Sequence, residues 1–239
     1  MMETEKHEVI RLLKKDEIYN LSIIGFIQEN NLEKFIRVDN SVLVQGCKEE
    51  KWIYFSGNDK KEFNELIKKL GPGDKYFGAM DDWMIHLLTK DKQIDWLINA
   101  YQFHFPPEKE IPKNKFETKQ LTVRDTEFLI SQSNYKKILT VEYLNERIEK
   151  SISAGIYSNE KPVAWGLTHD DGSLGTLHVL EKYRRKTYAK EITISLIRQC
   201  REIGKIPFLQ CETKNIPAQK LVEKIGFERD RNVSWLKLE

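Results

Sequence analysis

The segment FPPEKEIPKNK, residues 105–115, constrains the fold more than any other stretch of the chain. It holds three prolines and five charged residues in eleven positions, and proline continues neither a helix interior nor a central strand. We therefore expect a linker here that divides the 239 residues into two domains, 1–110 and 111–239. With 40% hydrophobic residues, a chain of this length can bury a substantial core.

The hydrophobic pattern after the linker changes period repeatedly, which is typical of a mixed α/β domain. Apolar alternation and turn residues predict strands, and apolar spacing of three and four predicts helices. The expected order is a strand at 116–121, helices at 125–132 and 141–150, strands at 153–158, 161–169 and 173–180, a helix at 189–203, a strand at 207–212, a helix at 216–226 and a strand at 232–239.

The first half follows a similar order, although no residue-level repeat connects the two halves. We expect a helix at 15–28, strands at 41–47 and 51–56, a helix at 60–70, a strand at 75–78, a helix at 81–90 and a strand at 96–104. Two interpretations stay open at this point: two copies of one architecture, or an unrelated α/β domain in the first half.

The overall charge argues against partners that need a uniformly charged surface. Lys and Arg total 39 against 37 Asp and Glu, so a nucleic-acid coat or a membrane-surface protein is not expected. The cysteines at 47, 200 and 211 have no metal-ligand spacing, and we expect no metal. We find neither a signal peptide nor an apolar run of the ~20 residues that cross a bilayer, and expect a cytoplasmic protein.

The one local concentration of positive charge is YRRKTYAKE, residues 183–191, just before an expected helix. The first N–H groups of a helix lack intrahelical partners, so flanking cations there suit a phosphate group. The same place in the first half reads SGNDKKEF, in which Asp59 would oppose an anion. Only the second half is therefore expected to hold phosphate, although a solvated basic turn is the simpler alternative.

Three phrases, HVLEKYRRKTYA, PFLQCETKN and LVEKIGF, together resemble the GCN5-related N-acetyltransferase (GNAT) superfamily over residues 116–239. That signature runs V-x-P-x-x-R-x-x-G-x-G/A, then an asparagine, then a helix ending in Gly-Phe. The matching positions here are Val179, Glu181, Arg184, Thr187, Ala189, Asn215, Gly226 and Phe227. The chain looks most like the glycine N-acyltransferase-like, FR47-like branch, which implies an α/β fold with a mixed sheet and two tandem GNAT-like halves, the first degenerate.

The resemblance implies acyl-CoA, acetyl-CoA first, as co-substrate. Its pyrophosphate would meet the backbone N–H groups of residues 185–190, and its pantetheine would pair with the third strand of the second half. The residues implied in binding are Leu177, Val179, Arg184, Arg185, Lys186, Thr187, Tyr188, Ala189, Lys190 and Asn215. Asn215 stands before Pro217 and is equally suited to capping a helix.

Thr187 departs from the signature, which has glycine there. A branched side chain crowds both the ligand and a backbone of positive φ, although threonine is tolerable if φ stays negative. Its hydroxyl could also cap the helix or donate to a phosphate oxygen. We expect weakened binding, and we expect Thr187→Gly to tighten it while lowering thermal stability through helix propensity.

The chemistry of acyl transfer is less visible than the binding. The strand positions at which the family often has a Glu or His base hold Ser173 and Gly175, and Val222 replaces its tyrosine acid. Ser173 and Asp171 are the candidate catalytic residues, relaying a proton through water, and the rate should keep rising with pH.

We expect an acyl-CoA-dependent N-acyltransferase acting on a small-molecule amine or amino acid. The alternative is a GNAT-fold CoA-binding or interaction module without catalysis. The sequence leaves the acceptor, the acyl chain and the oligomeric state open.

Overall fold

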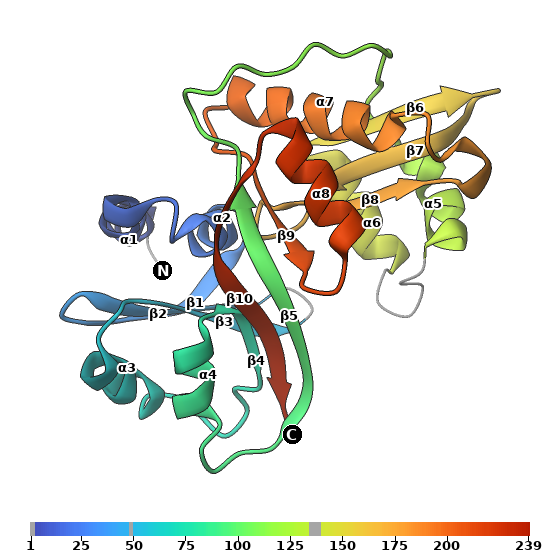
Figure 1. Ribbon diagram of the computed structural model, residues 1–239. Helices are drawn as coiled ribbons and strands as arrows, with labels where there is room; N and C mark the ends of the chain where they lie inside the picture. Colours follow the sequence, from blue (N-terminus) through green and yellow to red (C-terminus); the bar gives the residue numbers. More distant parts are fainter. Residues whose placement is uncertain (1–2, 48–49, 134–139) are drawn as a thin grey trace. The chain divides into compact units, whose positions relative to one another are not determined.

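The computed structural model describes residues 3–47, 50–133 and 140–239, and these form two compact units (Figure 1). The first unit contains Met1–Gln102 together with Gln210–Asn215 and Asp230–Glu239. The second contains Phe103–Leu209 and Ile216–Arg229. The chain thus returns twice to the first unit after leaving it, and the division into domains at residues 110 and 111 stays a prediction.

The first unit is built on a seven-stranded mixed sheet. Its elements are α1 (Glu3–Leu13), η1 (Lys14–Asp16), α2 (Leu21–Glu29), β1 (Asn31–Val38), β2 (Ser41–Cys47), β3 (Lys51–Ser56), α3 (Lys60–Ile67), β4 (Tyr76–Met80), α4 (Asp82–Leu88) and β5 (Ile94–His104). The strand order is β1-β2-β3-β4-β10-β5-β9, in which β9 is Phe208–Glu212 and β10 is Glu228–Leu238. Strand β3 is parallel to β4, whereas β10 is antiparallel to it.

Two expectations for the first unit are wrong. The helix expected at 15–28 is broken, because the Asn20 side-chain amide donates to the Leu13 and Asp16 carbonyl oxygens, both at 2.9 Å, where the first helix ends. Strand β1 was not expected, since its sequence NLEKFIRV does not alternate polar and apolar residues with a period of two. It is held instead by its antiparallel pairing with β2.

The second unit is a three-stranded antiparallel sheet with helices on both faces. Its elements are η2 (Val123–Asp125), α5 (Thr126–Gln132), α6 (Val141–Lys150), β6 (Ser153–Ser158), β7 (Lys161–Thr168), β8 (Leu174–Val179), η3 (Glu181–Tyr183), α7 (Tyr188–Glu202) and α8 (Ile216–Ile225). The strand order is β6-β7-β8. The strand expected at 116–121 is absent from the described residues except for one bridge between Lys119 and Gly155.

Successive residues of β7 point to opposite faces of this sheet, and their contacts show which helices cover each face. Gly166 faces α7, because a Cβ there would lie 2.9 Å from Ile192 and 3.1 Å from Leu196. Trp165 and Leu167 point to the opposite face, where they join a core cluster with residues of α5 and α6.

The proline-rich segment is a strap along α7 rather than a loose linker (Figure 1). The Arg198 guanidinium donates to Asn114 Oδ1 at 2.6 Å, and the Arg201 guanidinium donates to the Lys109 carbonyl at 2.7 Å. The Glu191 carboxylate, 1% exposed, accepts the Lys115 backbone N–H at 2.6 Å. Side chains of α7 thus replace the backbone pairing that prolines prevent.

Candidate functional site

Strand β8 is an edge strand with a bulge, which makes it able to pair with a ligand. Trp165 pairs with His178 and Leu167 with Gly175, so Gly166 alone faces both Thr176 and Leu177. Thr176 has a φ of 48°, and Leu177 is 39% exposed. The bulge therefore twists the edge and presents an apolar side chain to solvent.

Beyond the bulge, the backbone of Val179 faces away from the sheet. The Leu180 N–H donates to the Val163 carbonyl at 3.0 Å, and successive N–H groups of a strand point to opposite sides. The Val179 N–H and carbonyl therefore lie at the open edge of β8, where the carbonyl accepts the Arg184 Nε–H at 3.2 Å. This edge offers both a donor and an acceptor.

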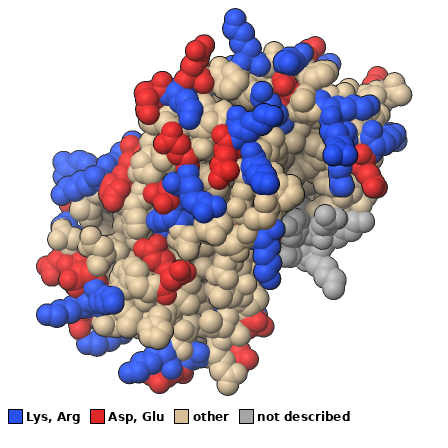
Figure 2. Space-filling model, viewed as in Figure 1, with Lys and Arg blue, Asp and Glu red and all other residues tan. Residues whose placement is uncertain are grey.

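The loop from residue 180 to 187 carries its cations into solvent. The side chains of Lys182, Arg184, Arg185 and Lys186 are all exposed. Figure 2 shows blue side chains gathered over this end of the second unit, near the turn between β6 and β7. The loop leads into α7, whose first N–H groups have no acceptor within the helix. An anion at this helix start would meet backbone donors and mobile positive charge together.

Thr187 is the N-cap of α7 and lies in the left-handed region, with φ 66° and ψ 0°. Arg185 also has a positive φ, 63°. The Thr187 hydroxyl donates to the Lys186 carbonyl at 2.6 Å and makes no side-chain cap. The condition of a negative φ is therefore not met. Thr187 also precedes the helix, so the helix-propensity cost behind the expected loss of stability on glycine substitution does not apply.

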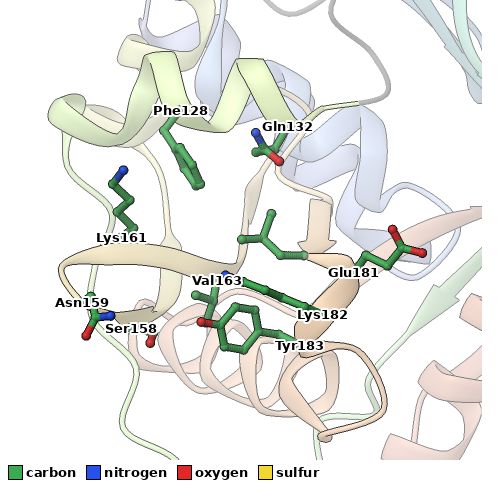
Figure 3. A pocket seen from close by; sticks show the side chains of 10 residues that line it. Phe128, Gln132, Ser158, Asn159, Lys161, Val163, Glu181, Lys182 and Tyr183 are labelled. Carbon is green, nitrogen blue, oxygen red and sulfur yellow. The ribbon is translucent and has the colours of Figure 1, made fainter.

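A pocket of about 830 Å³ opens beside the loop, on the sheet face that carries α5 (Figure 3). Its lining residues are Phe128, Gln132, Ser158, Asn159, Lys161, Val163, Leu180, Glu181, Lys182 and Tyr183. A hydrogen bond with the Ser158 hydroxyl lowers the pKa of Tyr183, and the neighbouring Lys182 and Lys186 charges lower it further. Two aromatic rings, two ammonium groups and one carboxylate suit a planar group bearing negative charge.

The sequence did not indicate this pocket. Phe128 precedes the loop by more than fifty residues in the sequence, and only the fold brings α5, the hairpin turn and η3 together. The one available signal was Lys161, a cation directly after the turn-forming residues Asn159 and Glu160, both of positive φ.

The two candidate catalytic residues lie together in the turn before β8. The Ser173 hydroxyl and backbone N–H donate to the same Asp171 carboxylate oxygen, at 2.6 Å and 3.0 Å. Both residues are buried, at 1% and 4% exposure, and burial raises the pKa of Asp171. Their side chains are thus engaged with each other, and their part in catalysis stays a proposal.

The remaining candidates are more dispersed. Asn215 follows β9 and belongs to the first unit, whereas residues 177–190 belong to the second. Val222 is buried in α8. His178 stacks on Trp165 at 4.6 Å, and burial followed by the nearby Arg184 charge lowers its pKa. His178 is therefore a neutral side chain packed against the core.

The corresponding helix start in the first unit is closed to anions. Asp59 caps α3 by accepting the backbone N–H groups of Lys61 at 2.7 Å and Glu62 at 3.0 Å. These two hydrogen bonds lower the pKa of Asp59, so its negative charge occupies the donors that a phosphate would use.

Comparisons with known proteins agree with this geometry. Residues 153–236 match the family model of FR47-like proteins. A Drosophila protein of solved structure aligns over 100% of this chain and 97% of its own, with a TM-score of 0.83 and 14% identity. A GCN5-related N-acetyltransferase-like protein from Streptococcus suis aligns over 95% and 98%, with a TM-score of 0.58 and 14% identity.

A tandem GNAT protein from the clavulanic acid biosynthesis pathway aligns over 92% of this chain and 87% of its own, with a TM-score of 0.50 and 8% identity. No curated protein matches in sequence. The chain has a GNAT fold with an FR47-like second half, and its match to a tandem protein is consistent with two GNAT-like halves. The fold expected from the sequence is confirmed.

Two kinds of feature are absent from the described residues. No helix in that part of the chain is both long and apolar enough to cross a membrane. The same residues contain no cluster of three His, Cys, Asp or Glu side chains placed to hold a metal ion.

Proposed function

We propose that the chain is an acyl-CoA-dependent N-acyltransferase that moves an acyl group, acetyl first, to the amine of a small molecule or amino acid. The observation that carries this proposal is the open edge of β8, which presents the Val179 N–H and ends in the basic loop before α7. A pantetheine amide can pair with such an edge as an added strand would. The diphosphate would then reach residues 185–190.

The pocket beside the loop would take the phosphate-bearing nucleotide end of CoA. It begins at Leu180, whereas the bulge lies at Thr176 and Leu177, about 10 Å earlier at roughly 3.3 Å per residue. This separation supports a pocket that would take the diphosphate end of CoA rather than the thioester end. Lys161 and Lys182 would face the 3′-phosphate, and the rings of Phe128 and Tyr183 would meet the adenine.

The acyl end would lie at the bulge. A backbone N–H at this edge can donate to the thioester oxygen as it gains negative charge. Ser173 and Asp171 remain proposed for the proton relay, through water, from the acceptor amine. The protein would act chiefly by holding the amine and the thioester together.

Isothermal titration with acetyl-CoA and longer acyl-CoAs tests the proposal. We expect binding, and we expect Arg184→Glu combined with Arg185→Glu to weaken it tenfold or more, because charge-assisted contacts to phosphate are lost. The matched control is Lys60→Glu combined with Lys61→Glu, at the helix start that Asp59 closes.

Absence of heat with every acyl-CoA would overturn the proposal. Equal losses in the two double variants would show that charge in general, and not this loop, carries the binding. If an acyl-CoA binds but no free CoA forms from it with any amine, the protein is a CoA-binding module and not an enzyme.

A further inference from the structure

The turn between β7 and β8 brings a histidine to the place left vacant at Gly175. A Cβ built on Gly175 would lie 1.9 Å from His169 Nε2 and 2.3 Å from Cδ2 of the same ring. The imidazole therefore covers the α-carbon of Gly175 and fills the space of a side chain there. Glycine at 175 is required by this contact, since any larger residue would displace the ring.

The ring lies on the face of the sheet that carries α5 and α6. Gly175 pairs with Leu167, and directly opposed residues of an antiparallel pair point to the same face. Leu167 belongs to the core shared with α5 and α6. The His169 ring is thus beside the bulge at Thr176 and Leu177, on the side of the sheet opposite α7.

The turn holds His169 firmly. Its N–H donates to the Ser173 carbonyl at 2.8 Å, and its carbonyl accepts from the Gly172 N–H at 3.0 Å. The buried Arg147 guanidinium donates to the same carbonyl at 3.2 Å. His169 is therefore fixed at the backbone, and the residue as a whole is half-buried.

Among the described residues, charged groups of the same turn and of α6 lie near the His169 ring. Asp171 interacts with it electrostatically, Asp170 follows it in the chain, and Arg147 meets its carbonyl. Ser173 accompanies Asp171. The imidazole is the group of this cluster that is only half-buried and carries a ring nitrogen able to accept a proton.

We propose that His169, rather than the Ser173–Asp171 pair whose side chains are engaged with each other, is the proton acceptor of the transfer reaction. The neutral amine nitrogen attacks the thioester carbon, and its N–H proton passes to the His169 ring directly or through one water. The carbon–sulfur bond then breaks with its electron pair on sulfur. The imidazolium returns the proton to that thiolate, giving the amide and free CoA. The proposal rests on the proposed acyltransferase function.

The experiment pairs a binding readout with a kinetic one. Histidine ring signals are followed by NMR during titration with acetonyl-CoA, a ketone analogue that carries no thioester. CoA release from acetyl-CoA is measured between about pH 5.5 and 9.5 with glycine and ethanolamine as probe amines. We compare wild type, His169→Gln and the control His86→Gln, which changes an exposed histidine of α4.

We expect acetonyl-CoA to shift the His169 ring signals, and His169→Gln to lower kcat/KM near pH 7 by about 10²-fold while acetyl-CoA affinity stays unchanged. In contrast to the continuous rise expected from the sequence alone, the wild-type rate should level off at high pH, whereas the rate of the variant should keep rising. Combining His169→Ala with Gly175→His should recover activity, because the second ring enters the space that the first vacates. Gly175→His alone should not.

Three results would overturn the inference. Acetonyl-CoA could bind without changing the His169 signals, or His169→Gln could keep the wild-type pH profile, and either leaves the proposed function standing. Failure of acetonyl-CoA to bind at all would remove the proposed function and this inference together. A melting temperature measured for each variant separates loss of folding from loss of chemistry.

Discussion

The left-handed threonine at the start of α7 gives the sharpest stability prediction. Thr187 has φ 66°, and a residue with a Cβ costs roughly 1–2 kcal/mol in this region. Glycine removes that cost but loses about 0.5–1 kcal/mol through the greater freedom of the unfolded chain. Thr187→Gly should therefore stabilise the protein by roughly 0.5–1 kcal/mol, even though the change replaces a larger residue by glycine.

For a chain of this size, that gain raises the melting temperature by about 1–4 °C. The matched control is Thr140→Gly at the N-cap of α6, where φ is −81° and the hydroxyl accepts the Tyr143 N–H at 3.0 Å. The same substitution there should destabilise by a few tenths of a kcal/mol, since it removes a cap without relieving strain. Differential scanning calorimetry compares the two variants with wild type.

Equal destabilisation by both glycine substitutions would refute the reasoning, because it would mean that φ at Thr187 costs nothing. The same preparations report on binding. Removing the Thr187 side chain clears the approach to the backbone of the loop, so acetyl-CoA should bind Thr187→Gly more tightly than wild type. Weaker binding would show that the hydroxyl itself contacts the ligand.

Other perturbations address the pocket, the turn and the thiols. Lys161→Ala and Lys182→Ala should each weaken CoA binding several-fold but change dephospho-CoA binding little, because dephospho-CoA lacks the 3′-phosphate. Equal losses of affinity for the two ligands would contradict the assignment of the 3′-phosphate to this pocket. Burial raises the pKa of Asp171, so the folded state favours the protonated carboxyl. The contribution of this group to the free energy of unfolding is complete below its unfolded pKa of about 3.9 and is lost as pH rises through its folded pKa. Asp171→Asn should therefore be more stable than wild type at about pH 8 but not at about pH 3.5, in denaturant titrations. Burial raises the pKa of Cys200 to about 12, so iodoacetamide at about pH 8 should modify it only after unfolding, as mass spectrometry of the native protein would show.

The sequence predicts those helices and strands whose hydrophobic pattern lies within the element itself. The amphipathic stripe of α7 and the apolar runs of β6, β7 and β9 appear in the structure close to their expected bounds, because each depends on its own side chains. Strand β1 was missed since its pairing with β2, and not its pattern, makes it a strand. The expected strand at 116–121 failed for the opposite reason, because an apolar pattern there has no partner beyond one bridge.

The candidate site divides in the same way. The basic loop could be found from its concentration of charge, and Val179 from the resemblance of this segment to the GNAT signature. The ring of His169 over Gly175 could not, because it depends on how a turn of four residues folds back on the following strand. The strain at Thr187 was also out of reach, since threonine by itself favours negative φ and only the loop imposes the other sign.

The return of β10 to the first unit makes the order of synthesis a folding problem. This strand lies between β4 and β5, so the first unit lacks a central strand until residues 230–239 have emerged from the ribosome. Until then, the facing edges of β4 and β5 are exposed to pairing with other chains. The unit that is synthesised first can therefore complete its sheet only after the last strand has been made. We expect slow folding, a need for chaperones during synthesis, and no native-like product from residues 1–110 expressed alone.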